Sequence, residues 1–229
     1  MINIRREGVI IEITDLSFEN DGVMNPAVIA EGQTVHLFYR AVRKGNHSTI
    51  GYCRLDGPLK VVQRDEVPFM VPEFEYESQG VEDPRIVKIE DTYYMTYTAY
   101  NGINASGALA VSSDLKHFTK QGIITSQFTY AQFKELICSE VKYTSKYFRT
   151  YNKRAPQTES GQPVYLTDKN LVFFPRKING KLCFMHRIKP DIQFVSINSL
   201  DELTPDFWID YFMDFTHHIM FEPKYNHET

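Results

Sequence analysis

An internal repeat constrains the fold of this chain more than any other sequence feature. Three segments open a strand, and each leads through a turn into a second strand: Asn25-Pro26-Ala27-Val28, Asp83-Pro84-Arg85-Ile86 and Phe174-Pro175-Arg176-Lys177. Self-similarity at a period of tens of residues, in units of strands and turns, is typical of radially repeated β architecture. Equivalent positions of such units face one shared axis, so we predict an all-β fold in which Asp83 faces a common pocket.

Short β-branched and aromatic runs bounded by Gly, Asn and Asp predict the individual strands. These runs cover residues 35–42, 49–55, 86–89, 93–100, 107–112, 171–178, 182–188 and 192–197. Asn179-Gly180 predicts a tight hairpin, because both residues tolerate positive φ, and Glu31-Gly32 and Glu90-Asp91 take the matching place in the other repeats. No helical stretch stands out.

The repeat is uneven. Asn25 and Asp83 are 58 positions apart, whereas Asp83 and Phe174 are 91 apart, so we expect one domain over residues 1–229 with an inserted loop at 125–167. A long loop in a compact domain is commonly a lid or binding loop, and plain surface decoration is an equally good interpretation.

Composition indicates a globular protein with 229 residues, 42% of them hydrophobic, and a formal charge of −4. This charge gives no bulk attraction to nucleic acid or anionic membrane, so neither is an expected partner. Cys53, Cys138 and Cys183 are scattered, which favours reduced thiols. The first residues carry charge and precede no long apolar run, so we expect a cytoplasmic protein.

The hairpin alignment places three residue pairs at equivalent strand positions, where they would line one pocket: Tyr39-Arg40, Tyr97-Thr98 and His186-Arg187. The alternative for Arg40 and Arg187 is a solvated strand end or a structural ion pair.

Asp83 precedes a proline, which holds it extended and fixes the direction of its side chain. Arg85 is two residues on, and alternation along a strand predicts that it shares a face with Asp83 and keeps that carboxylate ionised. Two interpretations follow: a structural Asp–Arg ion pair that holds the start of the unit, or a general acid in a closed pocket.

A cationic group accompanies the third repeat. Lys169, His186 and Arg187 could converge on an oxyanion such as phosphate. His217-His218 has no carboxylate or cysteine spacing to support a metal site, so no metal is expected.

Several motifs together resemble glycoside hydrolase family 130, a family of β-mannoside phosphorylases and β-mannosidases on a five-bladed β-propeller. The motifs cover nearly the whole chain: Asn25-Pro26, Tyr39-Arg40, Ile50-Gly51-Tyr52, Gly80-Val81-Glu82-Asp83-Pro84-Arg85, Tyr94-Met95-Thr96-Tyr97-Thr98-Ala99-Tyr100, Ser113-Asp114-Leu115 and Phe174 to Lys181.

The resemblance implies inverting phosphorolysis of β-mannosidic bonds. Asp83 would be the proton donor, acting on the glycosidic oxygen through a sugar hydroxyl while inorganic phosphate attacks the anomeric carbon from the other face. Asn25 and Arg40 would hold the sugar in the −1 subsite, with Arg85 and Tyr100 as further substrate contacts. The implied partners are a β-mannoside oligosaccharide and inorganic phosphate as co-substrate, with no other cofactor.

The resemblance also implies that Lys169 and His186, with Arg187, bind the phosphate. In the hydrolases of the family carboxylates replace this pair and activate water, so an inverting β-mannoside hydrolase is the alternative. Phosphorylases usually carry an arginine just after the strand that ends at Tyr100, and residues 102–106 contain none; Lys120 stands where a further arginine is common.

The length of the chain departs further from the family pattern than these residues do. The family closes its ring with further blades, whereas 229 residues are expected to cover about three to three and a half blades, as a truncated propeller. A non-catalytic or inactive carbohydrate-binding propeller fragment is therefore a further alternative. Assembly into a homo-oligomer is compatible with the sequence.

Overall fold

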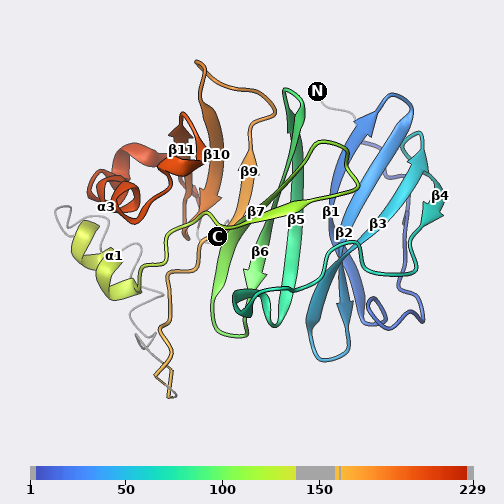
Figure 1. Ribbon diagram of the computed structural model, residues 1–229, viewed down its shortest axis with the longest axis horizontal. Coiled ribbons are helices and arrows are strands. Elements are labelled where there is room, and N and C mark those ends of the chain that lie inside the picture. Colours follow the sequence, from blue (N-terminus) through green and yellow to red (C-terminus); the bar gives the residue numbers. More distant parts are fainter. Residues whose placement is uncertain (1–3, 138–157, 160, 226–229) are drawn as a thin grey trace.

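The computed structural model describes residues 4–137, 158–159 and 161–225, and its strands form three consecutive antiparallel units that we call blades 1, 2 and 3 (Figure 1). Blade 1 consists of β1 (Gly22–Glu31), β2 (Thr34–Arg43), β3 (His47–Asp56) and β4 (Lys60–Arg64). Blade 2 consists of β5 (Gly80–Ile89), β6 (Thr92–Tyr100), β7 (Ala105–Ser112) and β8 (Thr119–Ile123). Blade 3 consists of β9 (Lys169–Phe173), β10 (Leu182–Arg187), β11 (Ile192–Ile197) and β12 (Ile219–Phe221).

Within each blade the strands pair in sequence order, and the first strands of neighbouring blades lie against each other, β1 against β5 and β5 against β9. Blades 1 and 2 are joined by a parallel bridge between Ser48 and Gly80. Gly80 permits this close approach, because a Cβ there would lie 2.9 Å from the Ser48 Cβ. The all-β prediction and the coverage of about three blades are therefore confirmed.

Most predicted strands agree with the structure to within two residues, and residues 192–197 match β11, whereas the strand predicted over residues 86–89 covers only the end of β5. The strand predicted over residues 171–178 is wrong in extent, because β9 begins earlier and ends at Phe173, before Pro175. A proline has no N–H to give to a sheet; Pro26 and Pro84 stand within β1 and β5 beside irregularities in the strand pairing, whereas Pro175 follows the end of β9. The predicted hairpin is confirmed: Asn179 and Gly180 have φ of 51° and 79°, and Ile178 pairs with Lys181.

The expectation that no helix stands out was wrong. Short 3-10 segments occur at Glu75–Glu77, Leu200–Glu202 and Phe215–His218, and the α-helices are α1 (Tyr130–Ile137) and α3 (Pro205–Met213). Thr204 caps α3 by accepting a hydrogen bond from the Phe207 N–H, and Pro205 occupies the first turn; this N-terminal signature was present in the sequence.

The two helices pack together at the blade 3 end of the molecule, where the Phe133 and Phe212 rings meet edge to face with centroids 5.0 Å apart (Figure 1). The predicted insertion at residues 125–167 includes α1, and its residues 138–157 and 160 lie outside the described part of the chain.

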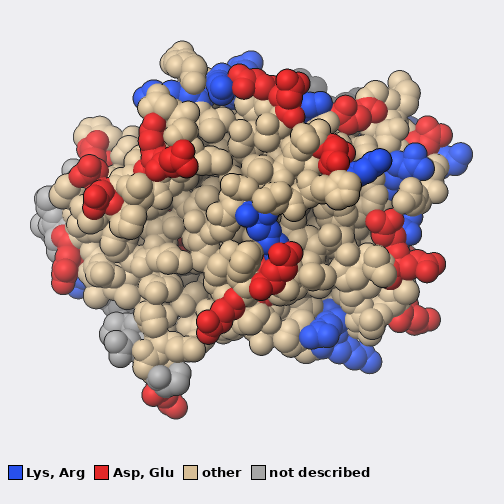
Figure 2. Space-filling model, in the orientation of Figure 1, with Lys and Arg blue, Asp and Glu red and all other residues tan. Residues whose placement is uncertain are grey.

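On the visible face, Figure 2 shows acidic and basic side chains interspersed over a largely uncharged surface. In the described residues, no helix is both long and apolar enough to span a bilayer.

Candidate functional site

The first strand of every blade carries the same distortion. In β1, Met24 pairs with Arg40 and Ala27 with Phe38, so one extra residue bulges out of the strand. The extra residue is accommodated around Asn25, which adopts a left-handed φ of 48°.

The other two blades repeat this bulge. In β5, Glu82 pairs with Thr98 and Arg85 with Thr96, and Asp83 has a φ of 50°. In β9, Lys169 pairs with Arg187 and Val172 with Met185, and Asn170 has a φ of 62°. Asn25, Asp83 and Asn170 are therefore equivalent positions.

This register corrects the third repeat. The sequence alignment matched Phe174-Pro175 to Asn25-Pro26 because of the shared proline, whereas the bulge of blade 3 lies at Asn170. The connection between β9 and β10 is longer than those between β1 and β2 and between β5 and β6. Pro175 lies in this connection and not beside the bulge. The predicted equivalence of Arg40, Thr98 and Arg187 on the second strands is confirmed by the pairing.

Asp83 lies at the centre of a polar cluster and is 9% exposed. Its Oδ1 accepts a hydrogen bond from Asn25 Nδ2 at 2.7 Å and a longer one from an Arg40 terminal nitrogen at 3.4 Å. Its Oδ2 has no hydrogen-bond partner among the described residues. One oxygen is thus held in place while the other is free for a ligand, which suits a proton donor.

Arg40 is shared between two carboxylates. Its guanidinium lies 2.8 Å from Glu82 Oε1 and 3.4 Å from Asp83 Oδ1, and its Nε donates to Ser48 Oγ at 2.9 Å. Burial raises the pKa of the Glu82 carboxyl, and the Arg40 guanidinium opposes that shift. Glu82 was not predicted as the main partner of Arg40, although two neighbouring acidic residues before a proline were the available signal in the sequence.

The predicted pairing of Arg85 with Asp83 is wrong. Arg85 donates to the Pro84 carbonyl at 2.7 Å, and among described residues no ion pair joins it to Asp83. Alternation places residues two apart on one face only in a regular strand, and the bulge at Asp83 breaks that alternation. Arg40 supplies the positive charge instead.

Tyr100 ends β6, where it pairs with Gly80, and its hydroxyl donates to the Gly102 carbonyl at 2.9 Å. No described side chain links Tyr100 to Asp83, so its predicted sugar contact stays a prediction.

Lys169 and Arg187 form a pair of cations for which the described residues provide no ion-pair partner. They are opposite each other in the β9–β10 register, and neither makes an ion pair or a side-chain hydrogen bond within the described residues. The Arg187 Nε is buried and has no acceptor. Lys169 begins β9, which lies against β5, the strand that carries Glu82 and Asp83. Its charge opposes the rise that burial causes in the pKa of the Glu82 carboxyl. Two unpaired cations at a partly buried place favour an anionic ligand.

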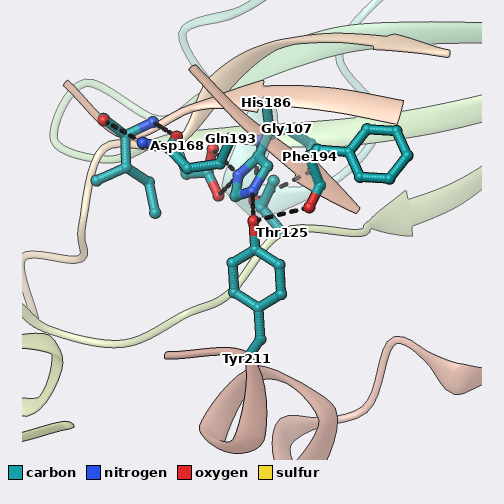
Figure 3. A network of polar contacts seen from close by, with 8 residues as sticks. Gly107, Thr125, Asp168, His186, Gln193, Phe194 and Tyr211 are labelled. Carbon is teal, nitrogen blue, oxygen red and sulfur yellow. Dashed lines mark hydrogen bonds and ion pairs between the residues drawn. The ribbon is translucent and has the colours of Figure 1, made fainter. Parts of the chain in front are cut away.

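His186 lies apart from this pair. It is completely buried, its Nδ1 is 2.8 Å from Asp168 Oδ2, and its Nε2 is 2.8 Å from the Tyr211 hydroxyl (Figure 3). The Tyr211 hydroxyl also donates to the Phe194 carbonyl at 3.2 Å. Adjacent strand residues point to opposite faces, so His186 faces this buried network while Arg187 faces the other side of β10.

Blade 1 contains a network of the same design. The Tyr39 hydroxyl donates to the buried carboxylate of Glu19 at 2.7 Å, and Arg64, from β4, lies 2.9 Å from the same carboxylate. Burial raises the pKa of the Tyr39 hydroxyl well above its ordinary value.

Blade 2 repeats this network with a lysine. The Tyr97 hydroxyl donates to Glu77 Oε1 at 2.7 Å, and Lys120, from β8, lies 2.6 Å from Glu77 Oε2. Tyr39, Tyr97 and His186 are thus equivalent residues bound to a buried carboxylate, and we call each network the latch of its blade. Lys120, which the sequence placed where phosphorylases often have an arginine, belongs to the latch of blade 2.

A separate groove of about 780 Å³ lies between blades 1 and 2. It takes in Thr34 and His36, at the start of β2, whereas Arg40 lies near the other end of that strand. Burial lowers the pKa of the His36 imidazole. The groove is therefore not part of the Asp83 cluster. Across the described ranges, no three His, Cys, Asp or Glu side chains are placed to hold a metal ion.

Comparisons with known proteins match most of the chain. The family model described as beta-1,4-mannooligosaccharide phosphorylase, for glycoside hydrolase family 130, matches residues 5–227. A 1,2-beta-oligomannan phosphorylase from Thermoanaerobacter sp. (strain X514) is 28% identical over 205 residues, covering 84% of this chain and 56% of the relative. A beta-1,2-mannobiose phosphorylase from the same organism is 27% identical over 208 residues, with the same coverage of 84% and 56%.

Solved structures show the same fold. A structure from the family of mannoside phosphorylases that contains glycoside hydrolases targeting beta-1,2 mannosidic linkages in Candida mannan has a TM-score of 0.62 at 22% identity. The match covers 86% of this chain and 55% of that one. The chain spans a little over half the length of the curated relatives it matches.

Proposed function

Because the chain belongs to glycoside hydrolase family 130, we propose that it takes part in the inverting phosphorolysis of β-mannosides, with Asp83 as the proton donor. Phosphate oxygen forms a bond to the anomeric carbon while the bond to the glycosidic oxygen breaks. The leaving oxygen receives the proton that Asp83 supplies. The products are mannose 1-phosphate and the shortened saccharide.

The unpaired cations are the observation that favours phosphorolysis over hydrolysis. Lys169 and Arg187 lie beside the Asp83 cluster without a described counterion, which suits a phosphate dianion. A water-activating carboxylate would be expected at such a place in a hydrolase. His186 is left out of this proposal, because contact with phosphate would require it to exchange both of its buried hydrogen bonds.

Asn25 and Arg40 hold Asp83 in position. Both reach Oδ1, so Oδ2 is the oxygen that we assign to proton transfer. Their contacts with the mannosyl unit in the −1 subsite remain proposals from the family resemblance.

The test is turnover of β-1,2- and β-1,4-mannobiose with and without inorganic phosphate, followed by detection of mannose 1-phosphate. Asp83→Asn is expected to reduce kcat by about 10²–10⁴-fold, the usual contribution of a general acid, while the folded structure is retained. Glu90→Gln, which changes an exposed carboxylate paired with Lys177, is the matched control and is expected to leave kcat unchanged.

Near-normal turnover by Asp83→Asn would remove Asp83 from this role. Undiminished release of free mannose in phosphate-free buffer would identify a hydrolase.

A further inference from the structure

The third bulge places a polar side chain that the proposed function has not used. Asn170 occupies in blade 3 the position that Asn25 and Asp83 occupy in blades 1 and 2, with the same extra residue and the same left-handed backbone. The Asn25 and Asp83 side chains meet at 2.7 Å. Since β9 lies against β5, the equivalent backbone carries the Asn170 side chain toward the same region.

The conformation of Asn170 is disfavoured for any residue that has a Cβ. Its φ is 62°, where glycine is at no disadvantage and other residues lose free energy. Asn tolerates this region better than most residues, but a glycine would relieve the backbone completely.

The Asn170 side chain does not offset this disadvantage through the protein. It is partly buried, and no hydrogen bond from its amide to any described residue exists. Asn25 differs, because its amide donates to Asp83. A polar side chain that is kept in a disfavoured conformation without a protein partner is typical of a ligand-contacting position.

We propose that Asn170 binds a hydroxyl group of the mannosyl ligand, as a specificity-determining residue on the blade 3 side of the site; this rests on the proposed function. An amide offers a donor and an acceptor, which matches a hydroxyl group. The neighbouring cations Lys169 and Arg187 match the phosphate instead, so the two ligands are read by adjacent but different side chains.

The test compares Asn170→Gly with Asn179→Gly. Asn179 is also a left-handed asparagine, with φ of 51°, but it is exposed in the β9–β10 turn. Binding of mannobiose is measured by calorimetry in the Asp83→Asn background, where turnover is suppressed. Thermal unfolding is measured on the same samples.

Asn170→Gly is expected to weaken mannobiose binding about 3- to 10-fold, the usual effect of one lost neutral hydrogen bond, while the melting temperature stays the same or rises. Asn179→Gly is expected to leave binding unchanged. Asn170→Asp, which keeps the shape and removes the donor, is expected to weaken binding as well. In the active protein, Asn170→Gly should raise the KM for mannobiose more than the KM for phosphate, and Lys169→Gln should do the opposite.

A lowered melting temperature for Asn170→Gly would show a structural role and overturn the inference, as would unchanged binding. Equal effects on both KM values would also overturn it. Full turnover by Asp83→Asn, in contrast, would refute the proposed function itself, so the two failures can be told apart.

Discussion

Removing the Lys120 ammonium should strongly destabilise the fold. Lys120 lies 2.6 Å from Glu77, and the side chains are 4% and 0% exposed. It also donates to the Val71 carbonyl at 2.7 Å. In Lys120→Met the Glu77 carboxylate stays buried without a nearby cation.

The remaining partners of Glu77 are too few to replace that charge. They are the Tyr97 hydroxyl at 2.7 Å and the Glu73 N–H at 2.9 Å. Breaking a buried ion pair by removing one partner typically lowers the free energy of unfolding by about 3–5 kcal/mol. With a urea m-value of about 2 kcal/mol per molar, the unfolding midpoint should fall by roughly 1.5–2.5 M.

The assay is urea unfolding followed by circular dichroism, with Lys116→Met as control. Lys116 is exposed in the turn that leads into β8, so its change should stay within about 0.5 kcal/mol. The double variant Glu77→Gln/Lys120→Met should be more stable than Lys120→Met alone, because it removes the unpaired carboxylate at position 77. A loss below about 1 kcal/mol for Lys120→Met, or a double variant no more stable than the single one, would refute the latch reasoning.

Three further outcomes test the core of blade 1. Burial raises the pKa of the Cys53 thiol from 9.0 to about 11, so Cys53 in the native protein should resist iodoacetamide at pH 8, as read from its own peptide by mass spectrometry, while Cys53 in urea-unfolded protein reacts; rapid native labelling of Cys53 would contradict this burial. The folded-state pKa lies above the unfolded one, so the stability that Cys53 contributes is complete below about pH 9 and is lost as pH rises toward 11; Cys53→Ala should show a smaller decline over that window. Gly51→Ala should lower the free energy of unfolding by about 1–3 kcal/mol, because its Cβ would lie 2.3 Å from the buried Tyr39 ring. Unchanged thermal unfolding of Gly51→Ala would show that the ring can move.

The sequence was most informative where local chemistry decides the backbone. Asn179-Gly180 predicted its hairpin because few residues accept two successive positive φ values. The hairpins in turn fixed the register of the second strands, so the equivalence of Arg40, Thr98 and Arg187 followed correctly.

The bulges could not be predicted from alternation. Each bulge inserts one residue, and the side chains beyond it change face. Regular alternation therefore predicted Arg85 as the partner of Asp83, whereas the structure has Arg40 there. Asn170 carries no proline beside it, so the third bulge had no marker in the sequence. The burial of His186 depends on Asp168 and Tyr211, which reach it from elsewhere in the chain, and no local pattern reports such a contact.

The latches also bear on how the molecule opens. In blades 1 and 2 each latch joins a segment before the first strand to the second and fourth strands of the same blade, across 43 positions in the case of Glu77 and Lys120. Contacts of this kind join segments of one blade and not neighbouring blades, so each blade has the character of a cooperative unit. A fluctuation that releases one latch would expose the amides of its own blade to solvent and leave the rest of the sheet protected. One blade can thus unfold locally while the other blades stay folded.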